Sequence, residues 1–215
     1  MNAMTLPDAL DVIHRQRRDA VVITTMGSAR DWQKLEPHPK DFVFMPSSMG
    51  QGPPLGLGIA LARPDQRVIV INGDGCLLMN LGCLVTITAH APKNLTLIII
   101  DNGVYEVTGN QATIGAAAKR ANGKSVDYLE LARAAGFETV YEFDDVEAWR
   151  YEQEIMHDPG PVCIVLKTAA RDNDLGARSP GPAPARAVAV VSRPLRSAAR
   201  RGVACHALLD ANMTG

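Results

Sequence analysis

The sequence predicts an α/β fold in which a doubly wound, mostly parallel sheet carries helices on both of its faces. Two observations support this prediction. The strand candidates are short apolar runs without polar alternation, which is typical of parallel strands buried on both sides. These runs alternate along the chain with segments of helical length. The strand candidates are residues 20–24, 41–44, 67–71, 95–100, 138–142 and 161–167, and the helix candidates are residues 6–18, 50–62, 77–90, 127–135 and 145–156.

Local signals place the first of these elements. Leu6, Leu10 and Ile13 recur at helical spacing and predict the first helix. The first strand is followed by a polar turn at residues 25–28. The segment 50–62 is rich in Gly and Ala, so we expect it to form a helix that packs closely against its neighbours.

The composition is that of an ordinary globular protein. The chain has 215 residues, 47% of them hydrophobic, and a net charge of −1, which gives no argument for nucleic acid or an acidic membrane as a partner. We find no signal peptide and no apolar run of about twenty residues, so we expect a soluble cytoplasmic protein. Cys76, Cys83, Cys163 and Cys205 lack metal-binding spacing and are expected to be free thiols.

Two neighbouring strand candidates end in residues that suit a hard metal ion. Asp74, within a Gly-Asp-Gly sequence, follows one strand, and Asn102 follows the next. A strand, a helix and a second parallel strand bring both strand ends to the same edge of a sheet, where open α/β folds bind ligands. Carboxylate and amide oxygens suit Mg²⁺, which takes further oxygens from a substrate phosphate. The pattern therefore indicates a bound diphosphate.

These residues also resemble the signature of thiamine diphosphate-dependent decarboxylases. Twenty-six residues, 76 to 101, separate the Gly-Asp-Gly sequence from Asn102, which is similar to the family's spacing. The resemblance is greatest to the β subunit of sulfopyruvate decarboxylase and to phosphonopyruvate decarboxylases. It covers residues 1–168 and implies the thiamine diphosphate-binding fold, with thiamine diphosphate and Mg²⁺ as cofactors. It rests as well on three flanking sequences, Ser48-Met49-Gly50-Gln51, Leu57-Gly58-Ile59-Ala60-Leu61 and Asn102-Gly103-Val104-Tyr105.

The resemblance implies a role for each residue of these motifs. Asp74, Asn102 and the backbone carbonyl of Val104 would bind Mg²⁺. Met49 would lie beneath the thiazolium and pyrimidine rings and force the bent cofactor conformation, which makes proton transfer from C2 intramolecular. The turn at residues 25–28 would bind the distal phosphate. The remaining cofactor-binding candidates are Thr25, Gly27, Ser28, Ser47, Ser48, Gly73, Gly75, Cys76 and Tyr105.

Three residues depart from the family pattern. Ser47 stands where relatives usually have Gly, and Cys76 stands where they often have Ser or Ala. Glu106 replaces the Gly that is more usual in the decarboxylases, and we expect it to affect substrate preference. The first two departures, with the unusual C-terminal segment, leave open the hypothesis of a non-catalytic structural subunit.

The implied function requires a second chain. In full-length decarboxylases a pyrimidine-binding domain precedes the segment seen here and offers the glutamate that activates the cofactor. We therefore assign no catalytic residue to this chain and expect an α subunit to supply that domain in a hetero-oligomer. The leading interpretation is the β subunit of a decarboxylase of a small acidic 2-oxo acid. The alternative enzyme is the small subunit of an acetolactate synthase-like carboligase.

The composition changes near Ala169. Residues 171–215 contain seven Arg, three Asp and four Pro, with many Ala. We therefore predict a mobile tail at residues 169–215, after a cofactor-binding domain of residues 1–168. A basic arm that docks a partner is the alternative.

Overall fold

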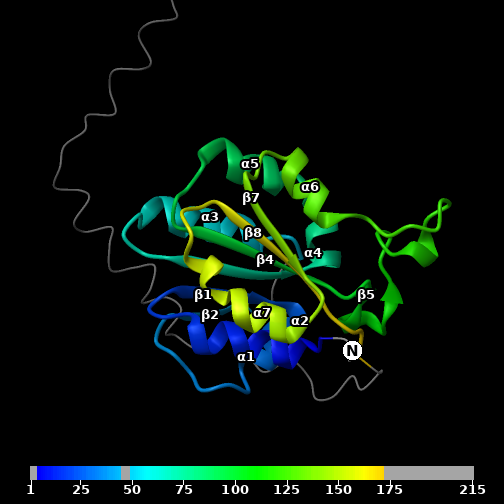
Figure 1. Cartoon of the computed structure of the whole chain (residues 1–215), viewed down its shortest axis with the longest axis horizontal. Coiled ribbons are helices and arrows are strands. Elements are labelled where there is room, and N and C mark those ends of the chain that lie inside the picture. Colours follow the sequence, from blue (N-terminus) through cyan, green and yellow to red (C-terminus); the bar gives the residue numbers. More distant parts are fainter. Residues whose placement is uncertain (1–3, 45–48, 172–215) are drawn as a thin grey trace, which may run out of the picture.

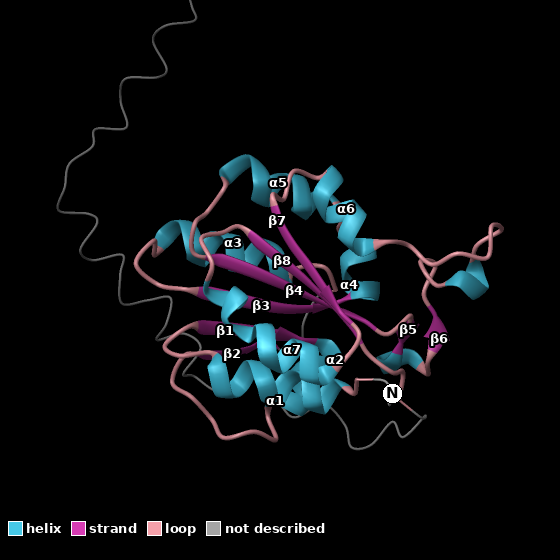
Figure 2. Ribbon diagram, viewed as in Figure 1, coloured by secondary structure: helices cyan, strands magenta, loops and turns pink. Residues whose placement is uncertain are grey.

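The computed structural model describes residues 4–44 and 49–171. The strands of the main sheet are β1 (Val21–Thr25), β2 (Asp41–Phe44), β3 (Val68–Gly73), β4 (Leu95–Asp101), β7 (Thr139–Phe143) and β8 (Val162–Lys167). They are all parallel and lie in the order β2-β1-β3-β4-β8-β7 (Figure 2). The short strands β5 (Val104–Tyr105) and β6 (Gln111–Ala112) form a separate antiparallel pair.

Helices cover both faces of this sheet. The α-helices are α1 (Leu6–Gln16), α2 (Met26–Trp32), α3 (Gly52–Ala62), α4 (Asp74–Leu78), α5 (Gly82–His90), α6 (Tyr128–Ala134) and α7 (Val146–Glu152). The 3₁₀ helices are η1 (Glu106–Thr108), η2 (Ala117–Lys119) and η3 (Gln153–His157). Helices α1, α2 and α7 pack on one face, and α3, α5 and α6 pack on the other (Figure 1). The predicted doubly wound fold is confirmed.

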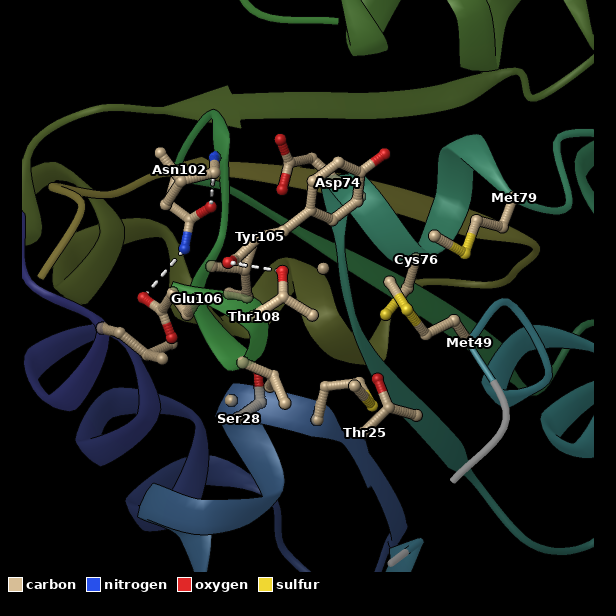
Figure 3. Close-up of a pocket in the computed structure, with 18 residues that line it drawn as sticks. Thr25, Ser28, Met49, Asp74, Cys76, Met79, Asn102, Tyr105, Glu106 and Thr108 are labelled. Carbon is tan, nitrogen blue, oxygen red and sulfur yellow. Dashed lines mark hydrogen bonds between the residues drawn. The ribbon is translucent and has the colours of Figure 1, made fainter. Parts of the chain in front are cut away.

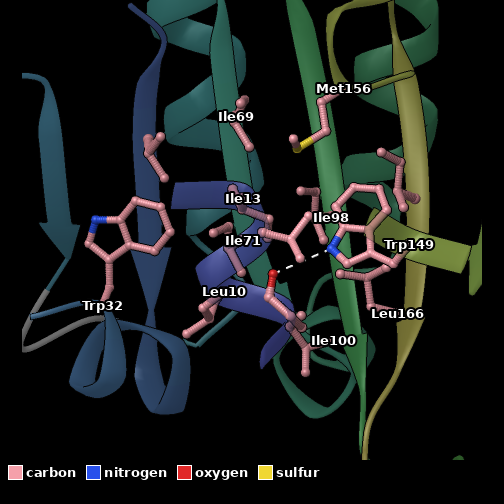
Figure 4. Packing of buried hydrophobic residues seen from close by; sticks show 14 of the residues in the cluster. Leu10, Ile13, Trp32, Ile69, Ile71, Ile98, Ile100, Trp149, Met156 and Leu166 are labelled. Atoms are coloured by element: carbon pink, nitrogen blue, oxygen red, sulfur yellow. Dashed lines mark hydrogen bonds between the residues drawn. The ribbon is translucent and has the colours of Figure 1, made fainter. Parts of the chain in front are cut away.

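The surroundings of the central strand β4 explain why apolar and polar residues do not alternate along it. Ile98 and Ile100 pack in the core beneath α1, α2 and α7 (Figure 4), whereas Leu97 and Ile99 pack beneath α3, α5 and α6. All four side chains are buried. Since a hydrophobic layer covers each face, neither set of alternate residues can be polar without a partner.

The packing of α1 brings the start of the chain to the carboxyl edge of the sheet. Thr5 caps the helix, because its hydroxyl oxygen accepts a hydrogen bond from the Asp8 N–H at 3.3 Å. The buried indole of Trp149 on α7 donates to the carbonyl of Ala9 at 3.3 Å (Figure 4). The Ala169 N–H donates to the Met4 carbonyl at 2.9 Å, so the end of β8 holds the same segment.

Two predicted segments differ from the structure. The polar turn expected at residues 25–28 is the first turn of α2, because Met26 adopts a left-handed backbone conformation (φ +51°) that leads β1 directly into the helix. The single helix expected at residues 77–90 is wrong. It is divided into α4 and α5, and the side-chain amide of Asn80 in the interruption donates to the Gly50 carbonyl at 3.0 Å.

Other predictions concern parts of the chain that the structure covers incompletely. Cys76, Cys83 and Cys163 are buried and free, as predicted, and Cys205 lies outside the described residues. The proposed tail lies outside them as well, apart from residues 169–171. Within the described ranges, no helix is both long enough and apolar enough to cross a membrane.

Two glycines of α3 offer a matched test of helix packing. A Cβ at Gly56 would overlap the Cγ2 atom of Val70 on β3, whereas a Cβ at Gly58 would meet no atom within 4 Å. Gly56→Ala should lower the free energy of unfolding by about 1–3 kcal/mol, because the helix must move away from a stiff side chain. Gly58→Ala should raise it by about 0.5–1 kcal/mol through helix propensity. Chemical denaturation measures both, and equal effects of the two substitutions would contradict this packing.

Candidate functional site

A cavity of about 210 Å³ lies at the carboxyl edge of the sheet, beyond the ends of β1, β3 and β4 (Figure 3). Ser47 and Ser48, which the sequence predicted to bind cofactor, lie outside the described residues. The other eleven predicted residues all line the cavity, and segments far apart in the sequence thus meet in one place. These residues are Thr25, Gly27, Ser28, Met49, Gly73, Asp74, Gly75, Cys76, Asn102, Val104 and Tyr105.

Asp74 is the most unusual residue of the cavity, because its carboxylate is buried and has no Lys, Arg or His partner among the described residues. The residue is 2% exposed, and the Thr113 hydroxyl donates to its Oδ2 at 3.3 Å. No ion pair of Asp74 exists among the residues that the structure describes. Burial raises the pKa of Asp74 to about 7, although backbone hydrogen bonds from Gly75 and Gly103 favour the charged form. A bound cation would remove this penalty.

Asn102 lies beside Asp74 because their strands are neighbours. In the parallel ladder Gly73 pairs with Ile100, so the residues that follow the two strands emerge at the same edge. The side-chain Oδ1 of Asn102 accepts a hydrogen bond from the Val104 N–H at 3.1 Å. Its Nδ2 donates to Oε1 of Glu106 at 2.9 Å. The orientation of the carboxamide is therefore set by two contacts.

The cavity is acidic as well as partly buried. Glu106 lines it, and burial raises the pKa of this carboxyl group. Asp101 precedes Asn102 at the end of β4, and burial raises its pKa to about 6 despite the opposing effect of Lys167. Carboxyl groups whose charged forms are disfavoured by burial create a site where a cation is strongly favoured.

Glycines allow the backbone and neighbouring side chains to approach closely here. A Cβ at Gly75 would overlap the ring of Tyr105, which packs directly on the turn after β3. A Cβ at Gly27 would lie 2.6 Å from Oε2 of Glu106. A Cβ at Gly73 would meet nothing within 4 Å, so the backbone at that point faces open space.

The junction between β1 and α2 forms another wall of the cavity. The Thr25 hydroxyl lies 3.2 Å from Oδ1 of Asn72 and 3.3 Å from the Ile71 carbonyl, so its proton is directed to β3. Ser28 is buried in the first turn of α2. The left-handed conformation of Met26 is one that a side chain disfavours, and such strain is concentrated at functional sites.

Sulfur-containing side chains form the opposite wall. Met49, Cys76 and Met79 lie close together in this part of the cavity (Figure 3). Burial raises the pKa of the Cys76 thiol, which keeps it neutral and argues against a nucleophilic role. Met79 is 55% exposed although it lines the cavity, so it offers apolar surface at the mouth.

Seven lining residues were not among the predicted cofactor-binding residues. Leu6 reaches the cavity from the start of α1, and Met79 follows α4, so neither stands in a motif that sequence reasoning could use. Glu106 was singled out as a departure from the family pattern that was expected to affect substrate preference. A signal existed for the loop after Asn102, because a lining residue at Tyr105 makes its neighbours candidates. The seven are Leu6, Met26, Met79, Ile100, Glu106, Val107 and Thr108.

The donor set fits a magnesium–diphosphate group better than a metal held by protein alone. No cluster of three or more His, Cys, Asp or Glu side chains that could hold a metal occurs within residues 4–44 and 49–171. A partial set of hard oxygen donors would instead come from three lining residues, through the carboxylate of Asp74, the carboxamide of Asn102 and the backbone carbonyl of Val104. Mg²⁺ commonly binds in this way, completing its shell with phosphate oxygens and water.

Known proteins with similar sequences include two that are named as decarboxylases or decarboxylase subunits. The chain is 41% identical over 125 residues to phosphonopyruvate decarboxylase from Streptomyces viridochromogenes, which covers 58% of this chain and 29% of that protein. It is 35% identical over 156 residues to sulfopyruvate decarboxylase subunit beta from Methanothermobacter thermautotrophicus, which covers 72% of this chain and 77% of that subunit. The chain thus spans less than a third of the first relative and about three quarters of the second.

A solved structure agrees at the level of the fold. It is that of a putative thiamin diphosphate-dependent enzyme from Mycobacterium smegmatis, with a TM-score of 0.63 and 22% sequence identity. The similarity covers 78% of this chain and 32% of that one.

A family model that matches residues 24–166 identifies the family of this protein. The family described as "Thiamine pyrophosphate enzyme, C-terminal TPP binding domain" matches residues 24–166, which include the ends of β1, β3 and β4 that surround the cavity. With more than half of the chain matched, this protein belongs to the thiamine pyrophosphate enzymes and contains their C-terminal cofactor-binding domain.

Proposed function

We propose that this chain is the β subunit of a two-chain decarboxylase that uses thiamine diphosphate and Mg²⁺ and acts on a small acidic 2-oxo acid. The observation that carries the proposal is the carboxylate of Asp74, which is buried beside Asn102 and forms no ion pair with any residue that the structure describes. The names of the similar proteins support decarboxylation of a sulfopyruvate- or phosphonopyruvate-like substrate. The length matched in the β subunit supports the two-chain arrangement.

In this proposal the chain anchors the cofactor through its diphosphate. Asp74, Asn102 and the Val104 carbonyl would hold Mg²⁺, which would neutralise charge on the diphosphate. The open space at Gly73 lets a phosphate approach the backbone, since no Cβ stands in the way. The first turn of α2, with Gly27 and Ser28, would form the second wall of the diphosphate site. Thr25 supports this wall through its contact with β3.

The remaining lining residues orient the rings and exclude water. Thiamine diphosphate, when bound, would supply the electron sink that decarboxylation requires. Met49 and Met79 offer apolar surface to the rings, and Tyr105 covers the turn at Gly75. The neutral thiol of Cys76 adds no negative charge beside the diphosphate.

The activating acid is proposed to come from another chain. Among the described residues that line the cavity, the carboxyl groups are those of Asp74 and Glu106. The first is assigned to the metal, and the second accepts a hydrogen bond from Asn102. An α subunit with a pyrimidine-binding domain would therefore supply the glutamate for the aminopyrimidine.

The outer surface of α3 and α5 offers a place for that partner. These two helices pack against each other and are apolar around most of their circumference, which is typical of helices buried on all sides. Leu61 is nevertheless 47% exposed and Val85 is 59% exposed. The exposed apolar face is what a permanently associated subunit would cover.

Reconstitution tests the proposed function. The chain is mixed with the pyrimidine-binding subunit of its own organism, Mg²⁺ and thiamine diphosphate, and CO₂ release from sulfopyruvate and from phosphonopyruvate is measured. We expect release from at least one substrate by the pair and none by either chain alone. Stable assembly without CO₂ release from any small 2-oxo acid would contradict the decarboxylase and favour a carboligase or a structural subunit.

Substitutions on the exposed face distinguish the partner surface from the site. Leu61→Glu combined with Val85→Glu should abolish assembly with the α subunit, as measured by size-exclusion chromatography, while the isolated chain keeps its fold. Tyr151→Glu is the matched control, because Tyr151 is 84% exposed on α7 at the opposite face of the sheet. Normal assembly of the double variant would place the partner elsewhere.

The pKa of Asp74 gives a further expected outcome. It rises from 3.8 to about 7 on folding, so the native chain binds this proton more tightly than the unfolded chain. Stability is therefore lost as the pH rises toward and through 7. Asp74→Asn should raise the Tm of the metal-free chain at pH 8, with little change near pH 4, and should abolish Mg²⁺-dependent cofactor binding. Asp144→Asn, at an exposed position, is the control, and a lower Tm for Asp74→Asn at pH 8 would contradict the account.

A further inference from the structure

Glu106 makes an unusual contact inside the cavity. Its side chain is 11% exposed, and Oε1 accepts the hydrogen bond from Nδ2 of Asn102 at 2.9 Å. Oε2 points toward Gly27, where a Cβ would lie only 2.6 Å away. A carboxylate is thus held between the turn after β1 and the residue that follows β4.

This contact determines which atom of the Asn102 carboxamide is offered to a ligand. In Figure 3 the amide nitrogen of Asn102 points to Glu106, and its oxygen lies on the side of Asp74. The same oxygen accepts from the Val104 N–H at 3.1 Å and retains a second lone pair. Rotating the carboxamide by half a turn would set oxygen against the carboxylate and nitrogen against an N–H donor. Both contacts would then be repulsive.

The carboxylate is itself held in place by its surroundings. Nε of Arg171 lies 3.8 Å from Oε1 of Glu106. Arg171 forms an ion pair with the buried Asp31 of α2. The backbone carbonyl of Arg171 accepts a hydrogen bond from the side-chain amide of Asn110. The end of β8, α2 and the loop after Asn102 are therefore tied together around Glu106.

We propose that Glu106 is a positioning residue for the metal ligand Asn102. The carboxylate of Glu106 accepts a hydrogen bond from the side-chain amide of Asn102 and thereby presents Oδ1 of Asn102 to Mg²⁺. The inference rests on the proposed function, because it requires Asn102 to be a metal ligand. Groups that hydrogen-bond to a metal ligand fix its orientation, and their loss commonly weakens metal binding by about 10–100-fold. A direct role in reading an acidic substrate is disfavoured, because a carboxylate would repel it.

The test measures Mg²⁺ dependence instead of turnover. Thiamine diphosphate is titrated by calorimetry into the reconstituted complex at increasing Mg²⁺, and the Mg²⁺ concentration for half-maximal cofactor binding is determined. Glu106→Leu should raise this concentration by about 10-fold or more, because the amide loses its acceptor. Cofactor binding at saturating Mg²⁺ should recover, which a general loss of structure would not allow.

Two further variants keep the test decisive. Glu106→Gln retains an acceptor oxygen of similar shape and should show an intermediate requirement, so it reports on the contact even where the leucine variant fails to fold. Glu138→Gln removes an exposed carboxylate elsewhere and should match the natural chain. An unchanged or lower Mg²⁺ requirement in both Glu106 variants would overturn the inference and indicate that the carboxylate competes with the diphosphate. Absence of Mg²⁺-dependent binding by the natural complex would instead overturn the proposed function together with the inference.

Discussion

The buried carboxylate of Asp74 is the interaction on which the site depends. A charge removed from water without a counter-ion costs several kcal/mol, which is why burial raises the pKa of Asp74 so far. Such a cost is typical of functional sites, where stability is sacrificed for binding. A divalent cation would convert the penalty into affinity. In the proposed function, the neighbouring carboxamide and the open backbone at Gly73 would serve a cation that brings a diphosphate with it.

The sheet supplies the rigidity that this arrangement requires. β3 and β4 lie side by side between two apolar layers, so the positions of Asp74 and Asn102 are fixed by the core and not by flexible loops. The outer side of α3 and α5 is different, because the apolar side chains of Leu61 and Val85 are exposed there. In the proposed function, a partner chain that contacts this apolar surface would complete the cofactor site.

Sequence reasoning succeeded where the determinants are local. Unbroken apolar runs predicted the parallel strands because both faces of each central strand are covered, and the Gly-Asp-Gly and Asn102 motifs predicted the edge where the cavity lies. It failed where contacts join distant segments. The interruption between α4 and α5 involves the contact of Asn80 with Gly50, and the place of Glu106 depends on Asn102, Gly27 and Arg171. No local pattern reports such contacts.

Anomalous diffraction from Mn²⁺ tests the central claim most directly. Mn²⁺ replaces Mg²⁺ in crystals of the reconstituted complex grown with thiamine diphosphate, and its position is read from the anomalous signal. The account predicts one peak bonded to the Asp74 carboxylate, the side-chain oxygen of Asn102 and the Val104 carbonyl. A cofactor bound in the cavity with Mn²⁺ elsewhere, or with an amide nitrogen of Asn102 facing the metal, would contradict it.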